Sequence, residues 1–189
     1  MVCKVRYLNS AGIMPREIKG VDALAKAFPP EWLLYVALNC YPRNQDQMEI
    51  DAFVVVEDQV LILEIKDWNP KLTYQNDRWF VGGQSRGRSA VLQVSEKARK
   101  LKSVLASEIP KIRDALWIEP RVVLTGQATR EHLHHTEKPY VWTLAEACSI
   151  ANTASRRQLL KPRRISLFKL YQFPESVTNH PSDRFQVAV

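Results

Sequence analysis

Apolar positions are concentrated in two runs between residues 50 and 66. Two runs rich in valine, isoleucine, leucine and phenylalanine, Ile50–Val56 and Val60–Lys66, are separated by the acidic pair Glu57–Asp58. Short apolar runs on either side of a tight polar turn predict the two β-strands of a hairpin. We therefore expect this hairpin to lie in the buried part of the fold.

Three charged residues, Asp51, Glu64 and Lys66, interrupt this apolar hairpin. Because side chains alternate between the two faces of a strand, Glu64 and Lys66 should share a face, about 6–7 Å apart along the chain. A turn centred on Glu57–Asp58 places Asp51 opposite Glu64, with their Cβ atoms roughly 4.5–5.5 Å apart. Burying two carboxylates and a lysine together is costly unless a cation or a substrate uses them.

The remaining pattern predicts further elements on both sides of the hairpin. Apolar residues at helical spacing predict helices over residues 16–28 and 89–107. Thr143 and Glu146 have the form of a capping box, which predicts a third helix from Thr143 to about Ala154. Strands are predicted at residues 32–41, 71–75, 78–81, 121–126 and 140–142, and a flexible basic loop with three glycines is predicted at residues 82–89.

Composition narrows the possible partners. The chain has 189 residues, of which 46% are hydrophobic, and a formal net charge of +7. This length suits one globular domain with an extension. The positive charge favours an anionic partner such as nucleic acid, although basic proteins of other kinds share it.

Cysteine spacing and hydropathy indicate in which cellular compartment the protein is expected. Cys3, Cys40 and Cys148 are widely spaced and form no CxxC pair, so neither a disulfide framework nor a structural zinc site is indicated. We therefore expect a reducing, cytoplasmic setting. The first ten residues lack the apolar run of a signal peptide, and no stretch approaches the ~18 apolar residues of a membrane span. We expect no membrane span.

The charged residues of the hairpin have the chemistry needed for phosphodiester hydrolysis. Mg²⁺ prefers oxygen ligands, usually one or two carboxylates together with water and substrate oxygens. Asp51 and Glu64 could be these ligands, and the backbone carbonyl of Ile65 could add another. Lys66 could orient or deprotonate the attacking water and contact the phosphate. In the alternative interpretation, Asp51 closes a turn and Lys66 forms an ordinary salt bridge with Glu64 on a solvated face.

These residues also carry a resemblance to a known family. Asp51, followed after twelve residues by Glu64-x-Lys66 on adjacent apolar strands, resembles the PD-(D/E)xK nuclease superfamily. The upstream helix with Glu17, the phrases EIDAFVVV and LILEIKDW, and Gln93 within AVLQ are similar to the NERD (nuclease-related) domain. The resemblance covers roughly residues 15–125.

The resemblance implies a fold, a cofactor and roles for individual residues. The implied fold class is α/β, a restriction-endonuclease-like αβββαβ core with a central mixed sheet flanked by helices. It implies a Mg²⁺ or Mn²⁺ site and DNA cleavage. Glu17 would be the helix acid, Asp51 and Glu64 the metal carboxylates, Lys66 the catalytic lysine and Gln93 a polar helix residue facing the site.

Several other residues are weaker candidates. Lys97 lies one helical turn from Gln93 and could reach a phosphate, or could simply be solvated. Trp68 and Trp79 could stack on bases, although tryptophans in a hairpin are more often core. The three histidines His132, His134 and His135 have no ligand partners at metal spacing, so we expect no metal there. The basic run at residues 156–164, with Arg156, Arg157, Arg163 and Arg164, is either a nucleic-acid contact or a solvated linker.

Three functional hypotheses follow. The first is a metal-dependent DNA endonuclease formed by residues 1–150, with residues 151–189 as a basic extension or linker to a further domain. The second is a nuclease-derived module that binds DNA without cutting it. The third is a partner-binding domain in which the acidic residues are structural. The family resemblance adds the expectation of fused or associated kinase or helicase modules, as in a multidomain anti-phage defence protein.

Overall fold

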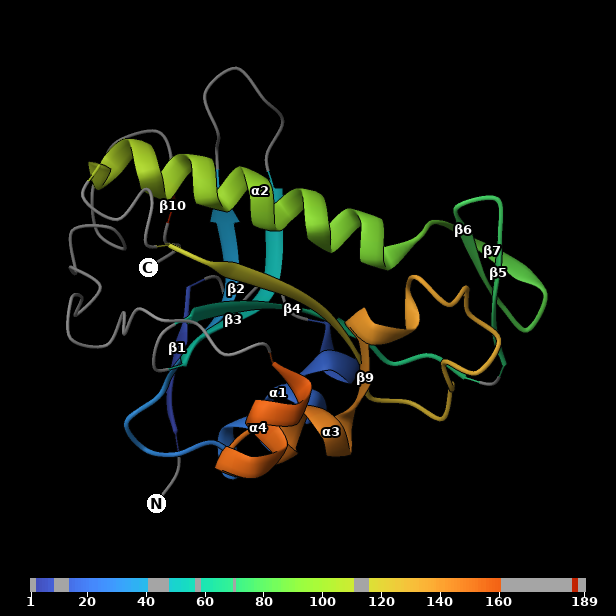
Figure 1. Cartoon of the computed structure of the whole chain (residues 1–189), viewed down its shortest axis with the longest axis horizontal. Coiled ribbons are helices and arrows are strands. Elements are labelled where there is room, and N and C mark those ends of the chain that lie inside the picture. Colours follow the sequence, from blue (N-terminus) through green and yellow to red (C-terminus); the bar gives the residue numbers. More distant parts are fainter. Residues whose placement is uncertain are drawn as a thin grey trace.

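A mixed β-sheet with helices on both faces forms the centre of the computed structural model (Figure 1). The structure describes residues 3–8, 14–40, 48–56, 59–69, 71–110, 116–160 and 185–186. The sheet contains β1 (Lys4–Tyr7), β2 (Leu33–Cys40), β3 (Met48–Val56), β4 (Gln59–Lys66), β8 (Ile118–Leu124), β9 (Val141–Thr143) and β10 (Phe185–Gln186). The helices are α1 (Pro15–Ala27), α2 (Ala90–Glu108), α3 (Leu144–Ser149), α4 (Thr153–Leu159) and the short 3-10 helix η2 (Lys138–Tyr140).

The strand order confirms the predicted fold class. The order is β1-β2-β3-β4-β8-β9, and β10 pairs with β2. Strand β3 is antiparallel to both of its neighbours, β2 and β4, whereas β1 is parallel to β2 and β8 is parallel to both β4 and β9. Read along the chain, α1-β2-β3-β4-α2-β8 is the αβββαβ core of a restriction-endonuclease-like fold.

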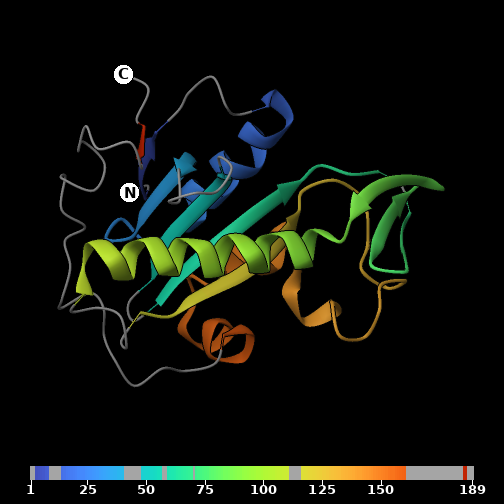
Figure 2. The same ribbon diagram turned by 90° about the horizontal axis from the view of Figure 1, so that it is seen from above.

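Alternating burial along the strands explains the three-layer arrangement. In β4, Val60 and Ile62 pack in one hydrophobic cluster with α2, while Leu61, Leu63 and Ile65 pack in a second cluster with α1 and α3. Figure 2 shows α2 running across one face of the sheet, and Figure 1 shows α1, α3 and α4 on the opposite side. Among the described residues, no helix is long and apolar enough to cross a membrane.

A second, smaller sheet lies beside the N-terminal end of α2 (Figure 1). It consists of β5 (Leu72–Gln75), β6 (Arg78–Val81) and β7 (Gln84–Arg88), and is called the minor sheet below. The predicted hairpin of β5 and β6 is confirmed, but the prediction of a flexible loop over residues 82–89 is wrong. Gly82 and Gly83, both with positive φ, form a tight turn, so the following residues can pair with β6 as a third strand.

The predicted helix from Thr143 to about Ala154 is also wrong in its extent. Its start is confirmed, because Thr143 caps α3 and its hydroxyl accepts a hydrogen bond from the Glu146 N–H. The helix ends at Ser149, and Asn152 caps a separate helix, α4, by accepting from the N–H groups of Ala154 and Ser155. Asparagine favours helix N-caps over helix interiors, which explains the break.

Residues 151–160, which the sequence assigns to the C-terminal extension, pack on the core. Leu160 is buried in the cluster on the α1 side of the sheet, and the Leu159 carbonyl accepts a hydrogen bond from Arg121. The guanidinium of Arg156 lies over the Trp32 ring, 5.5 Å from its centroid, a cation–π geometry.

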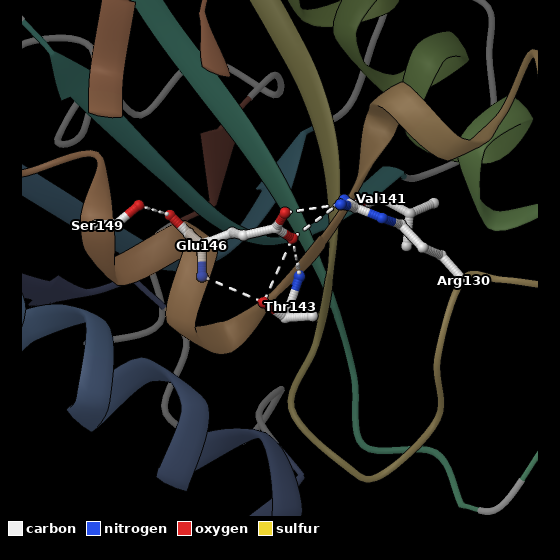
Figure 3. A network of polar contacts seen from close by, with 5 residues as sticks. All are labelled: Arg130, Val141, Thr143, Glu146 and Ser149. Atoms are coloured by element: carbon white, nitrogen blue, oxygen red, sulfur yellow. Dashed lines mark hydrogen bonds and ion pairs between the residues drawn. The ribbon is translucent and has the colours of Figure 1, made fainter. Parts of the chain in front are cut away.

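An ion pair ties α3 to the connection between β8 and β9 (Figure 3). The guanidinium of Arg130 donates to both carboxylate oxygens of Glu146, at 2.7 and 3.0 Å, and also to the Val141 carbonyl. A bidentate pair of this kind fixes the direction of both side chains. Because Glu146 also accepts from the Thr143 N–H, the pair fixes the end of β9 as well.

The minor sheet is held to the main body by a buried carboxylate. Glu137 is 5% exposed and accepts hydrogen bonds from Trp79 Nε1, at 2.6 Å, and from the Ser89 hydroxyl. Ser89 is the N-cap of α2, and its N–H donates to the Asp77 carbonyl in the turn between β5 and β6. One side chain therefore joins β6, the start of α2 and the loop before β9.

Removing this acceptor should destabilise the protein. Glu137→Ala leaves the indole N–H of Trp79 and the hydroxyl of Ser89 buried without an acceptor, which should lower the free energy of unfolding by ~2–4 kcal/mol. Urea denaturation would measure this. Glu131→Ala, at an exposed carboxylate nearby in the sequence, is the control and should change stability by less than ~0.5 kcal/mol. Equal stability of the two variants would contradict the role given to Glu137.

Candidate functional site

The three charged residues of the hairpin lie where β3 and β4 separate. The two strands pair from Val56↔Gln59 to Ala52↔Leu63, in the predicted register. Beyond Ala52, β3 continues to pair with β2 as far as Met48, while β4 pairs with β8 as far as Lys66. Two neighbouring strands thus diverge at the position of Asp51.

The Asp51 carboxylate replaces a backbone partner at this point. Asp51 Oδ2 accepts a hydrogen bond from the Ile65 N–H at 2.8 Å. The Ile65 N–H faces β3 where the two strands separate, so it has no backbone partner there. The bond to Asp51 avoids the cost of a buried N–H without an acceptor. The carboxylate is thereby held over the end of β4, beside Glu64 and Lys66.

Strand β2, the other neighbour of β3, has an irregular backbone opposite Asp51. Ala37 lies opposite Asp51 in the β2–β3 register and has a φ of 55°, a left-handed conformation that is unfavourable for alanine. The faces also shift there, because Ile50 and Phe53, three residues apart, belong to the same hydrophobic cluster. The site is therefore built at a local break in regular sheet geometry.

Glu64 is a buried carboxylate with two lysine partners. Its side chain is 5% exposed, and its two oxygens accept from Lys66 Nζ at 2.7 Å and Lys97 Nζ at 2.6 Å. Lys97 comes from α2, on the face of the sheet to which Glu64 points. Lys66 Nζ is also 3.9 Å from Asp51 Oδ2. Together, these four side chains form one charged cluster with two acids and two bases.

The two carboxyl groups differ in pKa because their partners differ. Burial raises the pKa of Asp51, and the negative charge of Glu64 raises it further, to about 7; the lysines and the Ile65 N–H offset only part of this. Burial alone would also raise the pKa of Glu64, but the charges and hydrogen bonds of Lys66 and Lys97 lower it overall. Glu64 is thus the more readily ionised member of the pair.

The pKa of Lys66 is raised above its usual value. Burial alone would lower it, but the charges of Glu64 and Asp51, the hydrogen bond to Glu64 and the more distant charge of Glu17 outweigh burial. Lys66 therefore carries a proton at neutral pH in this arrangement. Its chemistry here is that of a hydrogen-bond donor and a positive charge.

A polar pocket opens at the end of β4. Its volume is about 370 Å³. Glu17 reaches it from the first turn of α1, where its carboxylate also accepts from the Met14 N–H at 3.3 Å. Helix α1 lies close to the sheet at Gly20. A Cβ at this position would be only 2.7 Å from Thr125 Cγ2, so a larger residue would not allow this approach. The residues lining the pocket are Glu17, Ile65, Lys66, Asp67, Trp68, Asn69, Val81 and Arg86.

The donor set fits a hard divalent cation better than zinc. In the described ranges, no three His, Cys, Asp or Glu side chains are grouped closely enough to hold a metal. Two carboxylates and the Ile65 carbonyl match Mg²⁺, which is commonly held by one or two carboxylates with water and substrate oxygens. The distances from Lys66 Nζ, 2.7 and 3.9 Å, place Glu64 Oε1 at most 6.6 Å from Asp51 Oδ2. Such an ion would have to share Glu64 with two ammonium groups.

The described contacts of Gln93 and Arg156 go to residues outside this cluster. The Gln93 amide donates to the Arg88 carbonyl at 2.7 Å, and none of its side-chain hydrogen bonds within the described residues goes to Asp51, Glu64 or Lys66. Arg156 packs on Trp32, and Arg157 lies on α4 with it, whereas Arg163 and Arg164 lie outside the described residues.

The aromatic and histidine candidates have structural contacts. Trp79 is fully buried, and Trp68, which lines the pocket, packs edge-on against it with ring centroids 5.8 Å apart. The rings of His134 and His135 lie 4.2 Å apart, and Tyr74 packs on His134.

Sequence reasoning missed two features of the site. The sequence predicts that Lys97 contacts a phosphate or is solvated, but in the structure it is a partner of Glu64. Arg86 was assigned to a flexible loop, but it lines the pocket from β7. The sequence around Arg86, GGQSRGRS, is polar and rich in glycine, which is typical of a loop and does not indicate a strand.

Comparison with known proteins identifies the family. The model of the nuclease-related domain, NERD, matches residues 15–125, which is more than half of the chain and contains the whole charged cluster. The chain therefore belongs to the NERD family, whose general assignment is to the PD-(D/E)xK superfamily.

A curated relative is much longer than this chain. The chain is 25% identical over 144 residues to the protein named "Probable kinase PglW" of Streptomyces coelicolor. The similarity covers 73% of this chain but only 9% of that protein. No solved structure matches the chain significantly.

The raised pKa of Asp51 predicts how stability depends on pH. Between pH 3.8, the ordinary pKa, and about 7, Asp51 is more protonated in the folded protein than in the unfolded chain, so its contribution to stability should fall as the pH rises through this range. Asp51→Asn removes this loss while keeping an acceptor for the Ile65 N–H. In EDTA at about pH 8, the variant should be more stable than the wild type by roughly 1–3 kcal/mol. Each unit by which the pKa of Asp51 is raised is worth ~1.4 kcal/mol in favour of the variant, and the lost interaction with Lys66 offsets part of this gain.

Thermal unfolding across this pH range would test the expectation. The advantage of Asp51→Asn should shrink towards about pH 4, where the wild-type carboxyl is protonated in both states. Glu49→Gln, at an exposed carboxylate on the same strand, is the matched control and should give no comparable gain. A variant that is less stable than the wild type at about pH 8 would show that Asp51 is not an unfavourably buried charge.

Proposed function

We propose that this chain is a nuclease that hydrolyses DNA phosphodiester bonds with Mg²⁺ or Mn²⁺, with its active site at Asp51, Glu64 and Lys66. The observation that carries the proposal is the convergence of these three side chains where β3 and β4 separate. Membership of a nuclease-related family supports it independently. A positive net charge of +7 is consistent with a polyanionic substrate.

In this proposal, the acidic residues hold the cation. Asp51 and Glu64 would supply carboxylate oxygens and Ile65 its backbone carbonyl. A bound divalent cation would stabilise charge on the phosphate and lower the pKa of an attacking water. The raised pKa of Asp51 supports this role, because two close carboxylates favour a nearby positive charge.

Lys66 and Glu17 would act on the substrate side. Because the pKa of Lys66 is raised, its ammonium would donate a hydrogen bond to a phosphate oxygen or orient the attacking water. Glu17 faces the same pocket from α1, where its carboxylate can accept a hydrogen bond from a water. These two side chains would position the reacting groups next to the cation site.

The same cluster supports a second candidate function. Both carboxylate oxygens of Glu64 already accept from lysines, so its charge is compensated without a metal. A nuclease-derived module that binds DNA without cutting it would retain this arrangement. Cleavage assays separate the two candidates.

We also propose that the domain works within or beside a larger protein that contains a kinase. The support is the similarity to a protein whose name includes "kinase". The matched region covers only 9% of that protein. In that setting, the domain would supply the DNA-directed activity.

Plasmid nicking in the presence of Mn²⁺ or Mg²⁺ tests the proposed activity. Wild type should convert supercoiled DNA to nicked circles, and EDTA should stop the reaction. Asp51→Asn, Glu64→Gln and Lys66→Ala should each lower the rate by at least ~10²-fold, because each removes a group placed at the reacting phosphate.

The controls are chosen to match these changes. Glu49→Gln and Arg99→Ala alter exposed charges on β3 and α2 and should retain the wild-type rate. If the wild type binds DNA but nicks it no faster than the three site variants, the non-cleaving module is the better description.

The two lysines on Glu64 predict an effect on metal affinity. Lys97→Gln removes one positive charge from the cluster, so a divalent cation meets less repulsion and less competition for the carboxylate. Calorimetric titration with Mn²⁺ should show roughly three- to tenfold tighter binding than in the wild type. Arg99→Gln, an exposed neighbour on α2, is the control; weaker binding by Lys97→Gln would instead mean that Lys97 positions Glu64 for the metal.

A further inference from the structure

We propose that Arg86 of the minor sheet docks a phosphate of the DNA backbone beside the scissile bond, independently of base sequence. This inference rests on the proposed function and adds the residue that holds the flanking strand. It follows from where a β-bulge aims Arg86, from the pocket that Arg86 shares with Lys66, and from the contacts that fix the minor sheet.

A bulge in β7 determines the direction of Arg86. The β6–β7 pairs include Arg78↔Arg88 and Phe80↔Ser85, so two residues of β7, Arg86 and Gly87, lie opposite the single residue Trp79. Gly87 has a φ of 90°, a conformation that glycine adopts readily. Bulges of this kind redirect side chains, and they are common beside active sites.

The extra residue places Arg86 and Arg88 on opposite faces of the minor sheet. Trp79 and Val81 are buried, so the face they share with Arg86 is turned towards the main body and the pocket. Arg88 lies opposite Arg78 on the other face, where it forms a salt bridge with Glu96 at 2.8 Å. Without the bulge, the two-residue period of a strand would put Arg86 and Arg88 on the same face.

Arg86 has no competing partner in the described part of the chain. It is exposed, and it forms no ion pair or hydrogen bond with another described residue. It lines the pocket together with Lys66, whose ammonium forms a salt bridge with Glu64. Of the two basic residues that line the pocket, Arg86 is therefore the one with no described acidic partner to compete with an incoming anion.

Contacts of the minor sheet fix the backbone that carries Arg86. Glu137 ties Trp79 to the start of α2, and the Gly82 N–H donates to the Lys71 carbonyl at 3.0 Å. Arg86 therefore projects from a fixed strand beside the pocket, and the fork of N–H groups on its guanidinium matches two oxygens of a phosphate. Contacts to phosphate carry no base information, so the docking should be independent of sequence.

Binding of labelled nucleic acid tests the inference without requiring cleavage. Fluorescence anisotropy in EDTA would compare wild type, Arg86→Ala, Arg86→Lys and Arg78→Ala on a duplex of about 20 base pairs. Arg86→Ala should raise the Kd about tenfold and reduce the slope of log K against log salt by about one. Arg86→Lys should recover most of the affinity, since it restores the charge.

Arg78→Ala is the matched control because it removes the same charge from the opposite face of the same sheet. It should raise the Kd less than about twofold, because only long-range attraction is lost. Single-stranded DNA and RNA of the same sequence are parallel arms, and the polymer with the largest dependence on Arg86 identifies the source of the phosphate. In Mn²⁺, Arg86→Ala should raise the KM for nicking more than it lowers kcat.

The outcomes separate this inference from the proposed nuclease activity. If wild type fails to nick DNA but Arg86→Ala still weakens binding relative to Arg78→Ala, cleavage is refuted and the docking residue stands. If wild type nicks DNA and both arginine variants have equal affinity and equal salt slopes, the docking role of Arg86 is overturned. Absence of any nucleic-acid binding by wild type overturns both.

Discussion

The site depends on the hydrogen bond from the Ile65 N–H to the Asp51 carboxylate. It forms where β3 leaves β4, and it satisfies a backbone donor that the sheet no longer pairs. A continuous β3–β4 ladder would leave no room for polar side chains, because both faces of this sheet are packed with apolar residues. The divergence of two strands thus allows acidic groups to lie next to a hydrophobic core, and Ala37 on β2 takes up part of the distortion.

The electrostatics of the cluster follow from this location. Glu64 is nearly inaccessible to water, and a lone buried carboxylate would be strongly destabilising. Lys66 and Lys97 compensate it, while Asp51, next to the same negative charge, has a raised pKa. The protein therefore keeps a balanced cluster of four side chains, which the added charge of a cation or a phosphate can rearrange.

Much of the core was predictable from sequence because its signals are local. The hairpin of β3 and β4 follows from a strand period of two and a short turn, and these fix the register that brings Asp51 towards Glu64. The amphipathic pattern likewise gave α1 and α2 within a residue or two. The position of α2 along the sheet could not be predicted from the sequence. The amphipathic pattern places Lys97 on α2, but it does not show that α2 packs where Lys97 reaches Glu64. Arg86 escaped prediction because three nearby glycines resemble a loop, whereas in the structure they form a turn and a bulge that create the third strand of the minor sheet.

The central claim is that Asp51, Glu64 and the Ile65 carbonyl hold one divalent cation for DNA cleavage. Anomalous diffraction from crystals of the protein grown with Mn²⁺ and a DNA duplex tests it most directly. The account predicts one Mn²⁺ peak about 2.0–2.3 Å from an oxygen of each of these three groups, with Glu64 released from at least one of its two lysines. Crystals with DNA bound at the pocket, no Mn²⁺ at Asp51 and Glu64, and both lysines still on Glu64 would contradict it.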